Sequence, residues 1–317
     1  MKTSVCITIC SRQRPVLLAR ALTCLSQLNI PEDVDATFLV VENNDTPTYG
    51  PLIAEMQGKM RLLHVHEPVA GLTYARNKAI DTVHALGVDW MGCVDDDQLI
   101  DPDWLVHMVA ATKRYRKTAM FVGRWRRTEL PGTPTWLPKG KRAKKTSPTG
   151  ARLGDGAGGN AFIRADVFAP EGMALRYDHV YRFLGGEDTD FSLQYYHKGG
   201  IIRHVHEAVT SEDIPIERND LKGRLKREAW MQSVLTKLRH KHKSPVMAVS
   251  SSMQIIFRCA VLGVANLLLA LFALPFSRHF ALSRYGIGRE FLSQVQGVLR
   301  YYFGGPLEEP YRNTLGH

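Results

Sequence analysis

A short apolar run that ends in three consecutive aspartates constrains this chain most. Residues 89–94 have the character of a buried β-strand, and Asp95-Asp96-Asp97 follow without a break. Adjacent carboxylates repel one another unless a cation or hydrogen bonds offset their charge. Mg²⁺ or Mn²⁺ suits such a group, because these ions prefer oxygen ligands and keep positions open for phosphate. The alternative is an acidic turn before a helix that is predicted to begin at Asp101-Pro102, with Asp101 as its N-cap.

Strands and helices are predicted to alternate over the first 120 or so residues. The predicted strands are residues 4–10, 36–41, 61–66, 89–94 and 119–123, and the predicted helices are residues 15–28, 71–86 and 104–116. Such alternation is typical of a mostly parallel α/β sheet, which binds ligands at the carboxyl ends of its strands. The chain has neither a Gly-x-Gly-x-x-Gly after the first strand nor a P-loop motif, which argues against dinucleotide dehydrogenases and P-loop NTPases.

Polar residues follow the first two predicted strands. Arg12 and Arg14 come after the first strand, where they can hold the phosphates or base of a nucleotide, or be solvated charges at a helix start. Glu42 and Asn43 come after the second strand, where a carboxylate can accept hydrogen bonds from ribose hydroxyls or a base N–H. A plain turn is the alternative there, because Asn and Asp favour turns.

The pattern stops between residues 124 and 150. This segment contains Trp125, Trp136 and a basic run at residues 139–145, which is either solvated or in contact with an anionic headgroup or diphosphate. The glycine-rich run that follows, residues 154–160, allows the backbone to approach a ligand closely, or forms a flexible loop. A strand is expected at residues 161–163.

A second acidic pair, Glu187-Asp188, begins a predicted helix that runs to His197. Acids in the first turn of a helix are favoured by its dipole, and this position also suits a general base at the edge of a pocket. A short strand is predicted at residues 201–204. His206 follows it as a candidate metal ligand, although a lone histidine is more often structural.

The C-terminal third differs from the rest in composition. Residues 221–243 form a basic, amphipathic stretch, which is typical of a helix that binds a membrane surface or nucleic acid. Residues 259–276 are uncharged and apolar, at the lower limit of length for crossing a hydrocarbon core of about 30 Å. They can span a membrane, lie in its interface or form a buried core helix. Residues 283–303 form a further amphipathic stretch that ends in aromatic residues.

Charge and cysteine content add two expectations. A formal net charge of +10 suits an acidic partner, such as an anionic membrane or a phosphorylated substrate. Five scattered cysteines without a C-x-x-C pair predict reduced thiols in the cytosol, and the apolar residues 5–10 are too few for a signal peptide.

Six short motifs occur in one order along the first 220 or so residues: Ser11-Arg12-Gln13-Arg14-Pro15, Val40-Val41-Glu42-Asn43, Gly71-Leu72-Thr73-Tyr74-Ala75-Arg76-Asn77, Asp95-Asp96-Asp97 with Asp101-Pro102-Asp103-Trp104, Gly159-Asn160, and Gly186-Glu187-Asp188-Thr189-Asp190-Phe191. Together they resemble the family-2 glycosyltransferases with a GT-A fold. The chain looks most like the bacterial branch that builds exopolysaccharide, capsule or lipopolysaccharide repeat units on a lipid carrier, such as the succinoglycan-type glucosyltransferases. Glu42 departs from the family pattern, which more often has Asp there.

The resemblance implies a GT-A domain at residues 1–220, with a mixed, mostly parallel Rossmann-like sheet flanked by helices, and a helical membrane-associating region at residues 221–317. It implies a D-x-D motif that holds the nucleotide-sugar and Mn²⁺ or Mg²⁺, with Asp97 as first metal ligand and Asp95 and His206 as further candidates. Nucleotide contacts are then expected from Cys10, Arg12, Arg14, Glu42, Asn43, Arg76, Asp95 and Asp96. Asp188 is expected to act as the base beside Glu187, and Gly159 and Asn160 to contact sugar. Trp125 or Trp136 can stack on an acceptor sugar ring or belong to the core.

These expectations combine into one hypothesis, an inverting, metal-dependent hexosyltransferase. Its donor is expected to be a UDP-sugar and its acceptor a polyprenyl-diphosphate-linked saccharide at the cytoplasmic face of the bacterial inner membrane. A nucleic-acid-binding protein that uses residues 221–243 is the first alternative, but it leaves both acidic motifs and the apolar stretch unexplained. A metal-dependent nucleotidyltransferase is the second, and it would release diphosphate instead of a nucleoside diphosphate. The main hypothesis expects no nucleic-acid partner.

Overall fold

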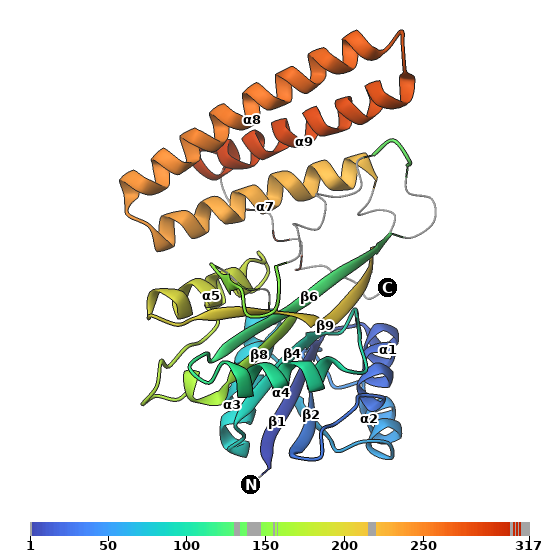
Figure 1. The fold of residues 1–317 in the computed structure, drawn as a ribbon, viewed down its shortest axis with the longest axis vertical. Helices are drawn as coiled ribbons and strands as arrows, with labels where there is room; N and C mark the ends of the chain where they lie inside the picture. The colour runs from blue at the N-terminus through green and yellow to red at the C-terminus, as the bar shows by residue number, and fades with distance from the viewer. Residues whose placement is uncertain are drawn as a thin grey trace. The chain divides into compact units, whose positions relative to one another are not determined.

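The chain folds into two compact units in the computed structural model (Figure 1), which describes residues 2–129, 134–137, 147–154, 156, 158–214, 220–304, 307, 309 and 311. The first unit contains Met1–Arg127, Thr146–Glu212 and Pro310–His317. The second contains Thr128–Lys145 and Asp213–Glu309.

The first unit is built on a mixed sheet. Its strands are β1 (Thr3–Ser11), β2 (Val34–Glu42), β3 (Leu62–His66), β4 (Trp90–Asp95), β5 (Gln98–Ile100), β6 (Met120–Glu129), β7 (Arg152–Leu153), β8 (Asn160–Arg164) and β9 (Ile202–Ile214). Their order is β3-β2-β1-β4-β8-β6-β9-β5, with β7 paired to β9. β1 to β4 pair in parallel, and β8 pairs antiparallel with β4 and β6. This confirms the predicted α/β sheet.

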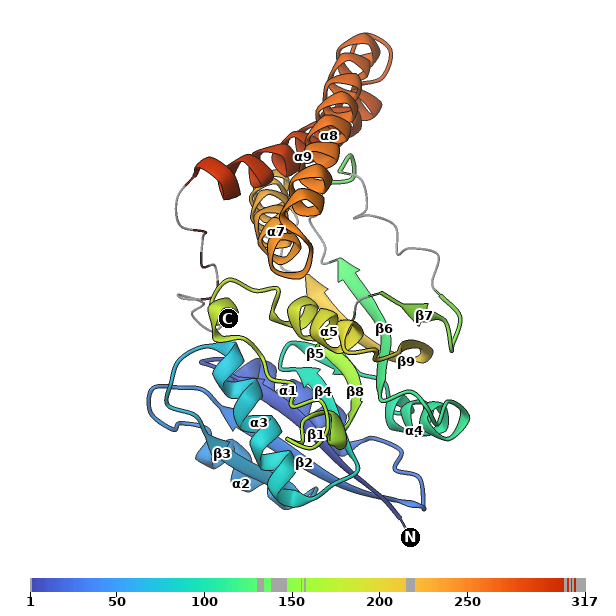
Figure 2. The same cartoon turned by 90° about the vertical axis from the view of Figure 1, so that its left-hand side faces the viewer.

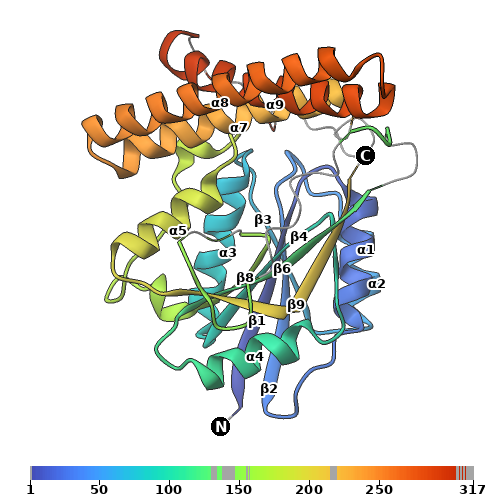
Figure 3. The same ribbon diagram turned by 45° about the horizontal axis from the view of Figure 1, so that its top comes forward.

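Helices cover both faces of this sheet (Figure 3). Along β1, Val5, Ile7 and Ile9 face a core formed with α1 (Pro15–Ser26), α2 (Gly50–Gln57) and α4 (Trp104–Arg114). Cys6, which points to the opposite face, belongs to a second core with α3 (Leu72–Leu86) and α5 (Glu187–His197). Burial on both faces explains why the strands are continuously apolar in sequence instead of alternating with polar residues.

Several predicted boundaries were wrong. The helix after the aspartate triplet begins at Trp104, as predicted, but it ends at Arg114 and its N-cap is Asp103, not Asp101. Asp101 instead accepts a hydrogen bond from the Asp103 backbone N–H at 3.1 Å, in the turn before the helix. β6 and β9 continue well beyond the predicted residues 119–123 and 201–204. The added part of β6, residues 125–128, is exposed and mostly polar, so it lacks the apolar pattern that marks a buried strand. The sequence also gave no prediction for α2 or β5.

The second unit contains three long helices, α7 (Leu221–His242), α8 (Pro245–Ala273) and α9 (Arg278–Phe303), which run side by side (Figure 2). α9 packs against both of the others. A Cβ atom on Gly288 would lie 3.0 Å from the Gly263 carbonyl oxygen of α8, and one on Gly297 would collide with the Ala229 carbonyl oxygen of α7. Among the described residues, α8 is the one helix whose length and apolar composition would allow it to cross a membrane.

Candidate active site

The carboxyl ends of three parallel strands meet at one edge of the sheet in the first unit. In the sheet register, Ser11 of β1 pairs with Glu42 of β2, and Cys10 of β1 pairs with Asp95 of β4. Polar residues that are far apart in sequence are therefore brought together where open α/β sheets bind their ligands.

The three aspartates have different environments. Asp96 is buried, and its carboxylate accepts hydrogen bonds from Ser11 Oγ at 2.7 Å and from Arg14 Nη1 at 3.1 Å. Burial raises the pKa of Asp96 to about 7, against the opposing effect of the Arg14 charge. The Asp95 and Asp97 side chains are 40% and 25% exposed, so the outer two carboxylates are the ones accessible to a ligand.

A buried arginine connects the aspartate triplet to the second acidic motif. Arg76, on α3, places Nη2 3.2 Å from Asp95 Oδ1. Its Nη1 lies 3.6 Å from Glu187 Oε1 and pairs with Asp188 Oδ1, both at the start of α5. Its guanidinium also lies over the Tyr177 ring, 5.3 Å from the centroid. One cation thus gathers carboxylates from two motifs that are far apart in the sequence.

The electrostatics of this cluster follow from burial. Burial by itself lowers the pKa of Arg76, but Tyr177 and the carboxylates of Glu187 and Asp95 more than offset that effect, so its pKa is raised overall. Burial also raises the pKa of Glu187, opposed chiefly by Arg76. Arg76 is therefore a permanently charged group in a water-poor site, where its interactions are stronger than at the surface.

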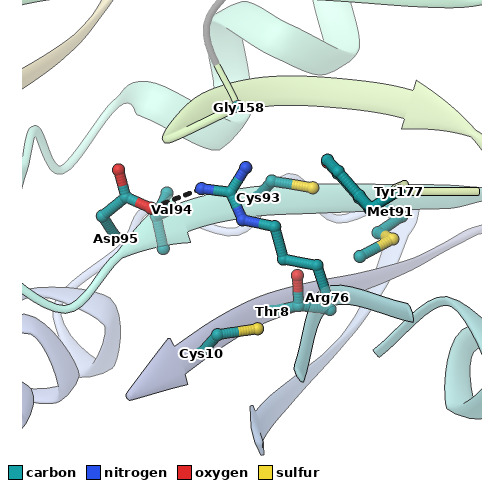
Figure 4. Close-up of a pocket in the computed structure, with 9 residues that line it drawn as sticks. All are labelled: Thr8, Cys10, Arg76, Met91, Cys93, Val94, Asp95, Gly158 and Tyr177. Carbon is teal, nitrogen blue, oxygen red and sulfur yellow. Dashed lines mark hydrogen bonds and ion pairs between the residues drawn. The ribbon is translucent and has the colours of Figure 1, made fainter. Parts of the chain in front are cut away.

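Two glycines let the backbone approach these carboxylates. A Cβ atom on Gly158 would collide with Asp188 Oδ1 and Arg76 Nη1, and one on Gly159 would collide with Asp95 Oδ2. A narrow pocket lies beside Gly158, and Figure 4 shows the Arg76 side chain extending across it toward Asp95. The other residues that line it are Thr8, Cys10, Met91, Cys93, Val94 and Tyr177.

Glu42 and Asn43 are both buried and bound by the chain itself. Glu42 accepts hydrogen bonds from Asn44 Nδ2 and from the backbone N–H groups of Thr48 and Tyr49 at the start of α2, and His64 Nε2 lies 2.9 Å from it. Asn43 donates to the carbonyl groups of Glu67 and Val69 and accepts from the Gly71 N–H. These contacts fix the loops after β2 and β3, and they leave neither side chain exposed at the surface.

The remaining basic and thiol residues at this edge differ in accessibility. Arg12 is partly exposed and pairs with Asp45 at 3.3 Å, while its Nε is buried without a hydrogen-bond partner in the part of the chain that the structure describes. Arg14 lies between Asp96 and Asp97, 3.5 Å from Asp97 Oδ2. Cys10 lines the pocket, and burial raises the pKa of its thiol.

The predicted sugar contacts are scattered. Asn160 is buried, accepts from Trp104 Nε1 at 2.7 Å, and donates to the carbonyl groups of Arg124 and Ala208. It therefore holds β8, β6 and β9 together. Trp125, on β6, is partly exposed beneath the Arg127 guanidinium, which lies 4.5 Å from the centre of its ring.

Three further predictions concern His206, Trp136 and the basic run at residues 139–145. His206, on β9, places Nε2 3.3 Å from Arg124 Nη1, and its buried Nδ1 has no hydrogen-bond partner among the described residues. Trp136 belongs to the second unit and not to the unit that contains the aspartate triplet. The basic run at residues 139–145 lies outside the described residues.

The oxygen ligands at this edge of the sheet fit a hard divalent cation. Asp95 and Asp97 supply carboxylate oxygens, and such ions are commonly held by one or two carboxylates together with water and substrate phosphates. Within the described ranges, no group of three or more His, Cys, Asp or Glu side chains is arranged to hold a metal by itself. A ligand shell here would thus be completed by the substrate.

Tyr177 and Gly158 are site residues that the sequence did not single out individually. Tyr177 lies in an irregular segment before a short 3₁₀ turn at His179–Tyr181, with no local pattern around it. Gly158 belongs to the glycine-rich run at residues 154–160, which the sequence marks only as a whole. What distinguishes Gly158 is the Asp188 side chain of α5 that lies against it.

Comparisons with known proteins agree with this geometry. The sequence model described as "Glycosyl transferase family 2" matches residues 4–170. The succinoglycan biosynthesis protein ExoM of Rhizobium meliloti (strain 1021) is 31% identical over 225 residues, which are 70% of each chain. The residues matched by the family model end before α5. Glu187 and Asp188 are therefore placed beside Arg76 by the structure and not by that match.

Solved structures with low sequence identity share the fold. S. aureus TarS 1–349 in complex with UDP-GlcNAc aligns with a TM-score of 0.54 at 12% identity, over 96% of this chain and 92% of that one. A longer TarS structure aligns over 95% of this chain, which spans 55% of its length. GalNAc-T7 with UDP, GalNAc and Mn²⁺ aligns with a TM-score of 0.54 at 16% identity, over 76% of this chain and 54% of that one.

Proposed function

The chain belongs to glycosyl transferase family 2, and on that premise we propose that it transfers a hexose from a UDP-sugar to a hydroxyl of a lipid-linked saccharide, with inversion at the anomeric carbon. The observation that carries this proposal is the position of Arg76 between Asp95 and Asp188. It puts Asp95, which could hold a metal for the donor's diphosphate, and Asp188, which could take the acceptor's proton, on either side of one cation.

The reaction uses Asp188 as the general base. The acceptor hydroxyl attacks the anomeric carbon as its proton passes to the Asp188 carboxylate. The bond between the anomeric carbon and the diphosphate oxygen breaks, and the nucleoside diphosphate leaves with that electron pair. A single displacement inverts the anomeric centre, so no covalent nucleophile is required.

The charge of the leaving group is balanced by basic residues and a metal. Arg12, Arg14 and Arg76 supply fixed positive charge at the edge where the diphosphate is proposed to bind, and such preorganised charge favours departure of an anion. Asp95 and Asp97 would hold Mn²⁺ or Mg²⁺, which stabilises charge on the departing diphosphate when it is bound. Asp96, Cys10, Glu42 and Asn43 are proposed to shape the nucleotide site, the last two through the loops that they fix.

The sugar and acceptor assignments rest on relatives. Two structures of similar fold hold UDP-GlcNAc and UDP with Mn²⁺, respectively, which supports a UDP-sugar donor and a divalent metal. The relative named for succinoglycan biosynthesis supports a role in bacterial surface polysaccharide synthesis. A polyprenyl-diphosphate-linked acceptor at the cytoplasmic face of the inner membrane fits the exposed apolar helix α8. Gly159 and Trp125 are proposed as contacts of the sugars.

A thermal-shift panel tests this function. Nucleoside diphosphates and sugar-nucleotides are each added with and without Mn²⁺, because a ligand that binds only the folded state raises the melting temperature. A Mn²⁺-dependent shift with UDP or one UDP-sugar is expected. No shift with any nucleotide, together with a clear shift on adding an oligonucleotide, would overturn the proposal in favour of nucleic-acid binding.

A further inference from the structure

Helix α8 has one packed side and one wide, unpacked side. Its buried residues recur every three, four or seven positions and form a seam of small side chains: Ala248, Ser252, Cys259, Gly263, Ala270 and Ala273. The opposite side is exposed and apolar from Phe257 to Phe272, as at Val261, Val264, Leu268 and Leu271. Only 17% of its most apolar window is buried, so α8 is not a core helix.

The seam of α8 lies on α9, and α9 is a charged helix. Arg284 of α9 donates to the Asn266 side chain in the second half of α8, at 3.4 Å. Glu290 of α9 pairs with Arg224 of α7 at 2.8 Å, with both side chains largely buried. Because α9 follows α8 closely, an upright α8 would draw these charged groups to bilayer depth, where ionised side chains are costly.

Basic residues lie at both ends of α8. Lys241 and Lys243 precede it, Arg278 and His279 follow it, and all four are exposed. Arg258 is exposed beside the apolar side. Basic groups at both ends suit a helix whose two ends both reach the headgroup layer of one anionic leaflet.

We propose that α8 lies flat in the surface of an anionic bilayer, with Phe257, Val264, Leu268 and Phe272 inserted and with α9 and α7 on the aqueous side. A helix of 29 residues is about 44 Å long, so a flat α8 presents a long apolar contact. A flat helix of this kind is buried about 5–10 Å into the headgroup and acyl boundary. This inference rests on the membrane association in the proposed function and gives it a geometry.

Serines flank α8, which makes its orientation measurable: Ser244 is its N-cap, and Ser277, four residues after its last residue, is the N-cap of α9. Ser244 and Ser277 are both exposed. Each is changed to cysteine in a separate variant of the full chain. Each variant is synthesised in the presence of sealed vesicles of phosphatidylcholine and phosphatidylglycerol. A membrane-impermeant maleimide added outside should label both Ser244→Cys and Ser277→Cys without detergent. The unaltered chain gives the background from the five native cysteines. If one of the two cysteines is labelled only after detergent is added, α8 spans the bilayer and the inference is overturned.

A third cysteine reports insertion. Phe257 is 74% exposed, so Phe257→Cys should react readily in solution and about ten-fold or more slowly once vesicles are added. Protection of Phe257→Cys without vesicles, together with a dimeric mass by light scattering, would identify the apolar side as an interface between two copies and overturn the inference.

A matched pair of charge insertions tests the contact itself. Leu268→Glu places a carboxylate in the centre of the proposed inserted side and should weaken vesicle binding about ten-fold or more. Leu86→Glu makes the same change at an exposed leucine of α3 in the first unit and should leave binding unchanged. If the unaltered chain fails to bind vesicles but still shows the nucleotide-dependent thermal shift, the membrane geometry is overturned and the transferase proposal stands.

Discussion

The guanidinium of Arg76 is paired with the carboxylate of Asp188 at the start of α5. The proposed base is thus paired with the cation that also contacts Asp95. A bound diphosphate is a stronger attraction for Arg76 than a single carboxylate, because it carries more charge on more oxygens. Donor binding is therefore expected to free Asp188 for the acceptor, so that the base becomes available only when there is a sugar to transfer.

The first prediction concerns Asp188. Asp188→Asn should keep the Mn²⁺-dependent shift with the nucleotide and reduce transfer by about 10²–10⁴-fold, because the amide cannot take the proton. Asp81→Asn, at an exposed aspartate of α3 that pairs with Arg176, is the matched control and should retain full activity. Full activity in Asp188→Asn would remove this residue as the base.

The second prediction concerns the stability of the buried ion cluster. Arg76→Met leaves the buried Glu187 carboxylate without its cation, and the free energy of unfolding should fall by about 3–5 kcal/mol in urea denaturation. Glu187→Gln added to Arg76→Met should recover part of that loss, because the unpaired charge is then gone. A double variant that is no more stable than Arg76→Met would contradict the proposed coupling.

The third prediction separates the members of the aspartate triplet. Asp97→Asn should abolish the Mn²⁺-dependent shift with UDP and change the melting temperature of the free protein little. Asp96→Asn should keep that dependence but alter stability by about 1–3 kcal/mol, because Asp96 is buried and bound to Ser11 and Arg14. The reverse pattern would show that Asp96, and not Asp97, holds the metal.

The sheet and the edge where the strand ends meet could be predicted because they depend on local signals. Apolar strands at residues 4–10, 36–41 and 89–94 are each followed by polar residues, and parallel pairing places those residues together. The packing of α5 on the sheet is different. It depends on contacts of Phe191 and Tyr195 in the second core, which no local pattern specifies.

What each polar side chain binds was the least predictable feature. Glu42 and Asn43 were expected to face a nucleotide, but the structure buries both in hydrogen bonds to nearby loops. The start of α2, which supplies two of the donors to Glu42, was not predicted, although Pro51 lies in its first turn, where proline is common. Asn160 was likewise expected at a sugar and is bound by Trp104 and neighbouring strands.

The fourth prediction follows from the burial of Glu42. Burial opposes ionisation, but hydrogen bonds from Thr48, Tyr49 and Asn44 outweigh it, so the pKa of Glu42 lies below its usual value. Such a group stabilises the folded state above the unfolded pKa of about 4.3, and this stabilisation is lost as the pH falls through the folded pKa. Glu42→Gln should therefore lower the free energy of unfolding by about 2–3 kcal/mol at neutral pH and by less below about pH 4.

Urea denaturation at several pH values measures this difference. Glu32→Gln, at an exposed glutamate before β2, is the control and should follow the unaltered protein at every pH. A Glu42→Gln deficit that stays constant down to acid pH would show that the side chain contributes through its shape and not through its charge.

The last prediction uses two glycines of one loop. Gly159→Ala puts a methyl group against Asp95 Oδ2 and 2.8 Å from Gln98 Nε2, so either Asp95 or the backbone of residues 158–160 must move. Gly154→Ala adds the same methyl group where no heavy atom lies within 4 Å. If Asp95 holds the donor's metal and ribose, Gly159→Ala should weaken UDP binding in the presence of Mn²⁺ about ten-fold or more, while Gly154→Ala should bind as the unaltered chain does. Titration of the thermal shift against UDP concentration gives both affinities, and equal affinities would mean that the nucleotide does not depend on the position of Asp95.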